Sequence, residues 1–290
     1  MTRIITSLSD ISESYDALFC DLWGCVHDGL APFAEAVTAL QAFRAKGCTV
    51  MLVTNAPRPH APVRRQLDRL GVPSDAYDGI ATSGDSARAA MLRGAVGEKV
   101  YFIGQPHDQD FFSPLELIEN PVTISHVPLE QAEGIVCCGP FDPLADPEEM
   151  RAQFLQAKTR GLKLLCANPD IVVDRGETRE WCAGALAKLY TQMGGESLYF
   201  GKPHPPIYDL ARRRLEALGK DIPDSRILCI GDGILTDIDG ALGEDLDSLF
   251  ITGGLAVHET QTTDQPEPAA LMAYLTKEMR QPTYSIGKLR

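Results

Sequence analysis

The sequence lacks an excess of basic residues and any long apolar segment. It has 27 lysines and arginines against 40 aspartates and glutamates, a formal net charge of -13 at pH 7. This charge argues against a protein that tracks nucleic-acid phosphates or binds an anionic membrane surface. No segment supplies the roughly 18 apolar residues of a membrane span, and the N-terminus has no apolar core of a secretion signal. We therefore expect a cytoplasmic protein that binds neither nucleic acid nor membrane.

The cysteines and histidines also lack the spacing of a metal or disulfide site. None of the eight cysteines forms a C-x-x-C pair, and most lie in apolar segments. In a cytoplasmic protein this pattern predicts buried, reduced thiols rather than disulfides or a zinc site. The six histidines are scattered along the chain. Because the chain is acidic overall, an anionic substrate would have to be held by a local group of cations or by a metal ion.

The chain does contain a repeated alternation of strand-like and helical segments. The apolar run 17–20 ends abruptly at Asp21, which is followed by a glycine-containing turn. Residues 33–46 then carry apolar side chains at helical spacing, and 48–53 is a continuous β-rich run. Strand, helix and strand in this order form a βαβ crossover, which implies a parallel sheet.

The same alternation continues to the end of the chain. Its 290 residues suffice for one large or two modest domains, and the composition, 44% hydrophobic and 23% charged, is that of a globular protein. We expect further strands at 80–84, 99–103, 134–138, 162–166, 226–230 and 248–252, and helices at about 61–70, 148–160, 207–218 and 268–279. The middle third of the sequence therefore looks like a second α/β domain.

Polar residues follow several of these strands at the point where each strand ends. Asp21 follows the first strand and Thr54 ends the second. Asp232 and Asp237 follow a later strand, and Lys202 lies in a turn before a helix. Open parallel sheets bind ligands at the carboxyl ends of their strands. A carboxylate nucleophile, a hydroxyl, a cation and an acidic pair for a hard metal ion are the groups that phosphoryl transfer needs.

With these motifs the sequence resembles the haloacid dehalogenase-like hydrolase superfamily. In particular it is similar to the class IIA phosphatases, which act on sugar phosphates, nucleotides and similar metabolites. The resemblance covers nearly the whole chain. The four motifs correspond to Asp21-Leu22-Trp23-Gly24, Thr54-Asn55, Gly201-Lys202-Pro203, and Gly231-Asp232 with Asp237.

The resemblance implies a three-layer, Rossmann-like α/β core with a parallel sheet and an inserted α/β cap domain. We expect the core at residues 1–85 and 195–290 and the cap at 86–194, because the long segment between the second and third motifs matches a class IIA cap. Closure of the cap would exclude water and complete substrate recognition.

The same resemblance implies a phosphoric monoester hydrolase that works through an aspartyl phosphate. Asp21 would attack phosphorus, while Thr54 and Lys202 hold the phosphoryl oxygens. The substrate and partner would be a small phosphorylated metabolite, such as a sugar phosphate or a nucleotide-like compound. The sequence does not identify it, and it leaves open whether the chain forms a homo-oligomer.

The cofactor that the resemblance implies is Mg²⁺. It would be bound by the Asp21 carboxylate, by the backbone carbonyl of Trp23 and by Asp232, with Asp237 supporting it directly or through water. Carboxylates and waters suit octahedral Mg²⁺, which reduces the repulsion between an anionic nucleophile and an anionic substrate.

Three further residues are candidates for substrate contact. Asn55 belongs to the second motif, and Arg58 follows it closely. Asp170 lies in the segment Asn168-Pro169-Asp170, which matches part of a class IIA cap. We expect these side chains to bind the substrate rather than to take part in the chemistry.

Trp23 is the departure from the phosphatase pattern. The phosphatases carry a second aspartate two residues after the nucleophile, and an indole can donate a hydrogen bond but cannot transfer a proton. Positioned acid-base catalysis contributes roughly 10²–10⁴-fold. The alternatives are therefore a phosphatase-like scaffold with little turnover, or a dehalogenase-like hydrolase, since the dehalogenases have an aromatic residue at this position. The presence of both Asp232 and Asp237 favours the metal-dependent phosphatase.

Overall fold

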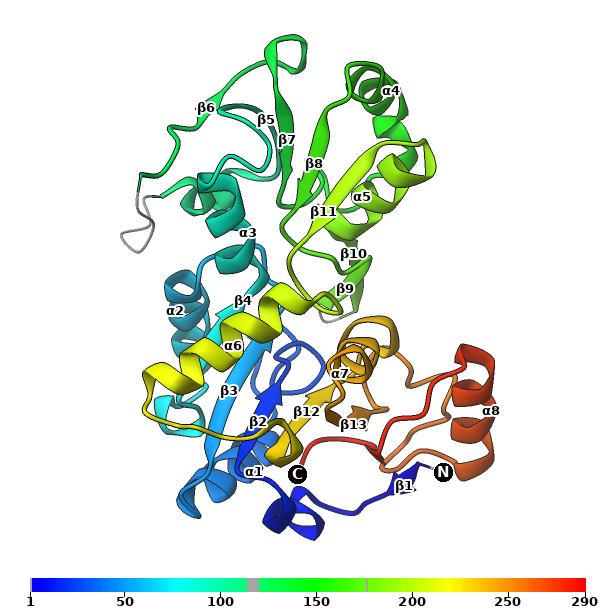
Figure 1. Cartoon of the computed structure of the whole chain (residues 1–290). Coiled ribbons are helices and arrows are strands. Elements are labelled where there is room, and N and C mark those ends of the chain that lie inside the picture. The colour runs from blue at the N-terminus through cyan, green and yellow to red at the C-terminus, as the bar shows by residue number, and fades with distance from the viewer. Residues whose placement is uncertain (1, 114–119, 176) are drawn as a thin grey trace. The chain divides into compact units, whose positions relative to one another are not determined.

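The computed structural model describes residues 2–113, 120–175 and 177–290. The chain divides into two compact units, and each has its own parallel sheet (Figure 1). The first unit comprises residues 1–54, 64–81 and 202–290, and the second comprises residues 55–63 and 82–201. Within the described ranges, no helix has the length and apolar composition needed to cross a membrane.

The first unit is built on a seven-stranded sheet in the order β1-β14-β13-β12-β2-β3-β4. β2 lies between β12 and β3 and pairs in parallel with both, so that Phe19 lies opposite Cys229 and Met51. The strands are β1 (Arg3–Ile4), β2 (Ala17–Cys20), β3 (Thr49–Thr54), β4 (Gly79–Thr82), β12 (Ile227–Gly231), β13 (Asp247–Ile251) and β14 (Tyr284–Ile286).

Both faces of this sheet are covered. On one face, Phe19 and Met51 pack against Ile207 of α6. Leu18 and Leu52 alternate with them, point to the opposite face and are also fully buried. The helices are α1 (Ala34–Ala45), α2 (His60–Leu70), α6 (Pro205–Ala217), α7 (Asp239–Gly243) and α8 (Pro268–Glu278). A parallel sheet buried on both faces is the three-layer α/β core that the sequence predicts.

The strand order of the first unit reverses beside β2. From β2 the chain adds β3 and β4 on one side, and after the second unit it returns to add β12, β13 and β14 on the other. Ligands of open α/β sheets bind outside the carboxyl ends of the strands at such a switch point. Asp21 and Asp232 follow the two strands that flank it.

The second unit contains a five-stranded sheet in the order β11-β8-β7-β5-β6 and a separate antiparallel pair, β9 and β10. Apolar clusters cover both faces of the larger sheet. The strands are β5 (Lys99–Ile103), β6 (Ser125–His126), β7 (Gly134–Cys137), β8 (Lys163–Cys166), β9 (Val172–Arg175), β10 (Thr178–Trp181) and β11 (Glu196–Tyr199). The helices are α3 (Ser83–Leu92), α4 (Arg151–Thr159) and α5 (Ala183–Gln192).

Most of the predicted strands and helices are present with slightly shifted ends. The β9–β10 pair is not predicted, because its strands are polar and partly exposed and show no apolar alternation. Helix α5 is not predicted either, because it is apolar on nearly every side and so has no amphipathic period. β11 pairs with β8 in the second unit, although the expected boundary at residue 195 would put it with the core.

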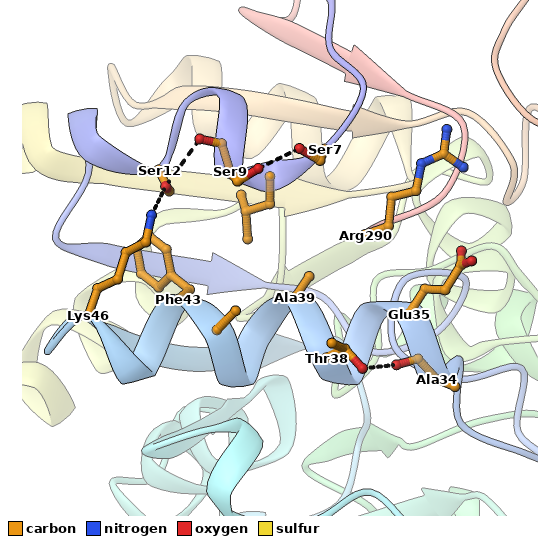
Figure 2. A pocket seen from close by; sticks show the side chains of 12 residues that line it. Ser7, Ser9, Ser12, Ala34, Glu35, Thr38, Ala39, Phe43, Lys46 and Arg290 are labelled. Carbon is orange, nitrogen blue, oxygen red and sulfur yellow. Dashed lines mark hydrogen bonds between the residues drawn. The ribbon is translucent and has the colours of Figure 1, made fainter.

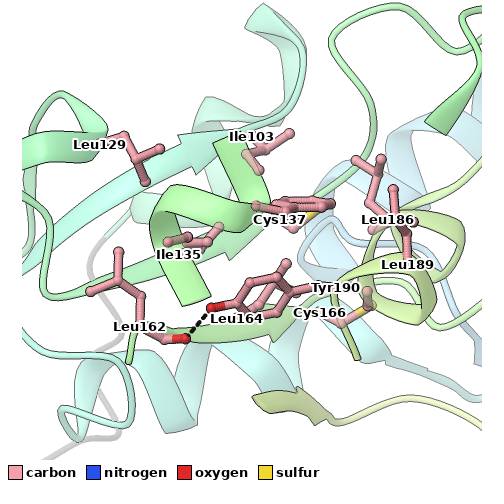
Figure 3. Packing of buried hydrophobic residues seen from close by; sticks show 14 of the residues in the cluster. Ile103, Leu129, Ile135, Cys137, Leu162, Leu164, Cys166, Leu186, Leu189 and Tyr190 are labelled. Atoms are coloured by element: carbon pink, nitrogen blue, oxygen red, sulfur yellow. Dashed lines mark hydrogen bonds between the residues drawn. The ribbon is translucent and has the colours of Figure 1, made fainter. Parts of the chain in front are cut away.

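Tyr190 belongs to one apolar cluster of the second unit (Figure 3). Its ring is fully buried and contacts Phe154, with 5.2 Å between ring centroids. Its hydroxyl donates a hydrogen bond of 2.5 Å to the carbonyl of Leu162. Tyr190 therefore joins α5 to the residue that precedes β8 through both apolar and polar contacts.

We expect Tyr190→Phe to lower the free energy of unfolding by about 0.5–1.5 kcal/mol, because it removes one buried hydrogen bond. Tyr190→Ala should cost about 3–5 kcal/mol, because it also leaves a cavity. Leu155→Ala, on the exposed face of α4, is the control and should stay within about 0.5 kcal/mol of wild type. Urea unfolding followed by circular dichroism measures all three, and equal losses for the two Tyr190 variants would contradict this account.

Candidate active site

Three neighbouring strands of the first unit bring candidate residues to one edge of the sheet. Asp21 follows β2, Thr54 is the last residue of β3, and Asp232 follows β12. Because these strands are adjacent and parallel, their carboxyl ends meet at the same edge. The backbone N–H of Asp21 donates to the carbonyl of Ile230 at 2.8 Å, which links the loop after β2 to β12. All three candidate side chains are buried.

The ammonium group of Lys202 joins this edge from a distant part of the chain. Its Nζ lies 2.6 Å from Oδ1 of Asp21 and 2.6 Å from Oδ1 of Asp237. The lysine side chain is only 4% exposed, so both ion pairs are shielded from solvent. Charge-assisted hydrogen bonds of this kind are about twice as strong as neutral ones. They hold the lysine beside the Asp21 carboxylate.

Asp237 lies on a π-helical turn, Ile234–Ile238, that follows β12. One of its oxygens accepts a hydrogen bond from Lys202, and the other accepts one of 3.0 Å from the backbone N–H of Gly233. Burial raises the pKa of Asp237, and the neighbouring Lys202 opposes that rise. Direct ligation of a cation by Asp237 would have to compete with these two bonds.

Glycines make room for the buried carboxylates. A Cβ atom on Gly231 would lie 2.0 Å from Cγ of Asp237, and one on Gly24 or Gly254 would lie 2.2 or 2.0 Å from Oδ2 of Asp232. None of these distances is compatible with a side chain. Gly24, Gly231 and Gly254 therefore have a packing role around the buried carboxylates.

Asp21 and Asp232 form a compact group with Cys25, in which one ligand atom from each lies within 4.8 Å of the others. Oδ2 of Asp232 also accepts a hydrogen bond from the backbone N–H of Leu255. Burial raises the pKa of Asp232 well above its ordinary value, and the charges of Asp21 and Asp237 raise it further. A divalent cation would relieve this repulsion, so the donor set fits a hard metal ion.

Cys25 is the member of this group that the sequence does not predict. All eight cysteines are expected to be buried thiols, and the structure confirms that they are free and that seven are buried. Nothing in the spacing of the cysteines singles out Cys25. Its position four residues after Asp21, within the first motif loop, is the available signal. Burial and the nearby carboxylates of Asp232 and Asp21 raise the pKa of its thiol.

Trp23 is held in the loop that follows the candidate nucleophile. Its ring lies edge-on to that of His27, with 5.1 Å between centroids. A Cβ atom on Gly29 would lie 2.3 Å from the indole, so the ring packs directly on the glycine backbone. Nδ1 of His27 accepts a hydrogen bond of 3.1 Å from the N–H of Gly29. The indole is therefore fixed by its own loop.

The three candidate substrate contacts belong to the second unit. Nδ2 of Asn55 donates a hydrogen bond of 2.8 Å to Oδ1 of Asp170, so the structure brings these two residues together. Arg58 is half-buried, and its carbonyl lies against Gly84 at the start of α3. The sequence does not indicate the bond between Asn55 and Asp170, which are 115 residues apart.

A separate pocket of about 450 Å³ lies along helix α1 (Figure 2). The chain before β2 covers it, and its lining includes Leu8 and Phe43. Lys46 donates a hydrogen bond of 2.7 Å to Oγ of Ser12 at one end, and Arg290 lies toward the other. Its described lining includes none of the predicted site residues, so it belongs to a different part of the first unit's surface.

Two family models match this chain. A haloacid dehalogenase-like hydrolase model matches residues 18–117, which include Asp21 and Thr54, and a HAD-hydrolase-like model matches residues 199–277, which include Lys202. A hydrolase of the haloacid dehalogenase-like family from Brucella suis 1330 is 40% identical and has a TM-score of 0.85, covering 99% of this chain and 100% of that chain. The chain belongs to the haloacid dehalogenase-like hydrolase family. This confirms the family and fold predicted from the sequence.

This hydrolase is also similar to phosphatases. D-glycerol 3-phosphate phosphatase from Mycobacterium tuberculosis is 27% identical over 278 residues, which cover 94% of this chain and 72% of that protein. The crystal structure of a glycerol phosphate phosphatase from the same organism, in complex with calcium, shares the fold with a TM-score of 0.64 and 22% identity, covering 95% of this chain and 74% of that one.

We expect Gly231→Ala to destabilise the hydrolase by about 1–3 kcal/mol, because the new methyl group overlaps the Asp237 side chain and must displace it or the strand. Gly243→Ala is the matched control, since a Cβ atom there would meet no heavy atom within 4 Å and alanine favours the helix. Thermal and urea unfolding measure both. Equal stability of Gly231→Ala and wild type would show that Asp237 is not confined as described.

Proposed function

We propose that this hydrolase is a Mg²⁺-dependent phosphatase that acts on a small phosphorylated metabolite. The observation that supports this most strongly is the position of Lys202, 2.6 Å from the Asp21 carboxylate, where Asp21 also lies beside Asp232. A nucleophilic carboxylate, a cation for phosphoryl oxygens and a second carboxylate for a metal ion then share one buried edge. The similarity to the D-glycerol 3-phosphate phosphatase supports a phosphate monoester as substrate.

Asp21 is the proposed nucleophile. One of its oxygens attacks phosphorus, an aspartyl phosphate forms as the bond from phosphorus to the ester oxygen breaks, and the alkoxide or phenolate of the substrate leaves and takes a proton from water. Water then hydrolyses the acyl phosphate, which releases phosphate and restores the carboxylate. Lys202 and the buried hydroxyl of Thr54 bind the phosphoryl oxygens, and the lysine stabilises their negative charge in a site largely shielded from water.

Asp21, Asp232 and the backbone carbonyl of Trp23 are the proposed ligands of Mg²⁺. Gly24 lies against the Asp232 carboxylate, so the peptide that carries the Trp23 carbonyl is close to it. Asp237 would support the ion through water, because both of its oxygens are engaged. When bound, the ion reduces the repulsion between the nucleophile and an anionic substrate. The calcium in the related glycerol phosphate phosphatase supports a divalent cation.

Residues 86–194, in the middle of the chain, form the proposed cap. Asn55, Arg58 and Asp170 are the proposed substrate contacts. The hydrogen bond between Asn55 and Asp170 fixes the orientation of both side chains before substrate arrives, and such preorganisation lowers the cost of binding. The guanidinium group of Arg58, a half-buried residue, would attract an anionic substrate.

A phosphatase-like scaffold with little turnover is the second candidate function, and the environment of Trp23 favours it. The indole is held by His27 and Gly29, so a proton-donating group could take its position only if the loop rearranged. Without an acid beside Asp21, the substrates hydrolysed fastest should be those whose leaving groups need little protonation. A carbon-centred dehalogenase is disfavoured, because that reaction does not need a metal ion, whereas Asp21 and Asp232 lie together as possible ligands of one.

Asp21→Asn should abolish phosphate release from phosphorylated metabolites, aryl phosphates and acyl phosphates in the presence of Mg²⁺. The amide has nearly the same shape but is a poor nucleophile, and loss of a covalent nucleophile lowers kcat by a factor on the order of 10⁴ or more. Asp16→Asn is the matched control at the opposite end of β2 and should retain turnover. Activity of Asp21→Asn above a few per cent would remove Asp21 from the nucleophile role.

Trp23→Asp should raise the hydrolysis of alkyl phosphates more than that of aryl phosphates, by up to roughly 10²–10⁴-fold, because it supplies the missing proton donor. The ratio of the two rates is the control, since a cavity or misfolding would lower both together. If wild type already hydrolyses alkyl and aryl phosphates equally fast, another residue donates the proton, and Trp23 does not lower the rate of alkyl phosphate hydrolysis.

A further inference from the structure

Cys25 introduces sulfur into a site otherwise made of oxygen ligands. Its ligand atom lies within 4.8 Å of one carboxylate oxygen of Asp21 and one of Asp232. These are the two side chains proposed to hold Mg²⁺, so the thiol borders the position where a cation would sit. The side chain is 1% exposed, which keeps its direction fixed by the surrounding loop.

The contacts of the Cys25 thiol differ from those of two other cysteines of the first unit. Cys20 donates a hydrogen bond to the carbonyl of Asp21, and Cys48 donates one to the carbonyl of Tyr15. In the part of the chain that the structure describes, Cys25 has no side-chain hydrogen bond, although its sulfur is buried beside two carboxylates. The buried Cys25 sulfur, which lies within 4.8 Å of an oxygen of each of the two candidate ligands, is therefore available as a third ligand.

We propose that this site also binds thiophilic divalent cations, such as Zn²⁺, Cd²⁺ and Co²⁺, through the Cys25 sulfur together with oxygens of Asp21 and Asp232. The inference rests on the cation site of the proposed function. Mg²⁺ takes oxygen ligands and leaves the thiol protonated, whereas these softer ions accept sulfur. As the metal–sulfur bond forms, the thiol proton passes to solvent.

The spacing of the three residues is suitable for one ion. In a tetrahedral zinc shell, with zinc–oxygen bonds of about 2.0–2.2 Å and a zinc–sulfur bond of about 2.3 Å, an oxygen and a sulfur ligand lie about 3.6 Å apart. The three ligand atoms lie within 4.8 Å of one another, so any two of them would have to approach by no more than about 1 Å to bind one ion. A thiophilic ion would then occupy the Mg²⁺ position and exclude Mg²⁺ from it.

Titration of the metal-free protein with Co²⁺ tests the proposal, because a cobalt–thiolate bond gives a charge-transfer band in the near ultraviolet. Wild type should develop this band with one equivalent of Co²⁺, and excess Mg²⁺ should suppress it. Cys25→Ser should lose the band and bind Cd²⁺ at least about 10-fold more weakly, since even outer partners of metal ligands contribute about that much. Cys48→Ser is the control and should keep the band, because Cys48 precedes β3 at its amino end.

Co²⁺ binding to wild type without the band, or a band that survives in Cys25→Ser, would overturn the proposal. If Cys25→Ser does not fold, X-ray absorption spectroscopy of zinc-loaded wild type tests the proposal instead. We expect one sulfur ligand at about 2.3 Å from zinc, and a shell made only of oxygen ligands would contradict the proposal. No phosphate ester is present in these measurements. Failure to bind either Co²⁺ or Mg²⁺ would refute the cation site itself, whereas a sulfur-bound ion in a protein without turnover would refute only the proposed phosphatase activity.

Discussion

The ion pairs of Lys202 with Asp21 and Asp237 are the interaction on which the site depends. A buried charge costs several kilocalories per mole unless it is paired, and here one lysine is paired with two carboxylates while Asp232 lies close by. If all four groups are ionised, two negative charges remain uncompensated at this edge of the sheet. A bound divalent cation would balance them, and so the proposed metal is linked to the stability of the site as well as to its chemistry.

The surrounding structure keeps these charges close together. Parallel pairing of β2 with β12 brings Asp21 and Asp232 to the same edge. Gly24 and Gly254 leave the space that the Asp232 carboxylate occupies. The π-helical turn after β12 orients Asp237 so that it can bind Lys202 and the preceding backbone at once. The backbone therefore fixes the positions of these side chains, and the side chains supply the charges of the site.

Much of this arrangement could be predicted from the sequence, because it depends on local patterns. The apolar strands, the helical period of α1 and the polar residue after each strand indicate a parallel sheet with Asp21 at its carboxyl edge. Contacts between distant segments could not be predicted in this way. The pairing of Lys202 with Asp237 and the Asn55–Asp170 hydrogen bond depend on how loops pack in three dimensions. Cys25 was missed because a cysteine in an apolar loop resembles any other core residue.

The buried carboxylates should oppose folding when no metal is present, and the stability of Asp232→Asn tests this most directly. In EDTA the variant should unfold at a higher temperature than wild type, since it lacks one of the repelling charges. Mg²⁺ at about 100 times its dissociation constant should stabilise wild type by about 2.7 kcal/mol and should have little effect on the variant. A variant that is less stable than wild type in EDTA, or that gains as much from Mg²⁺, would contradict the account.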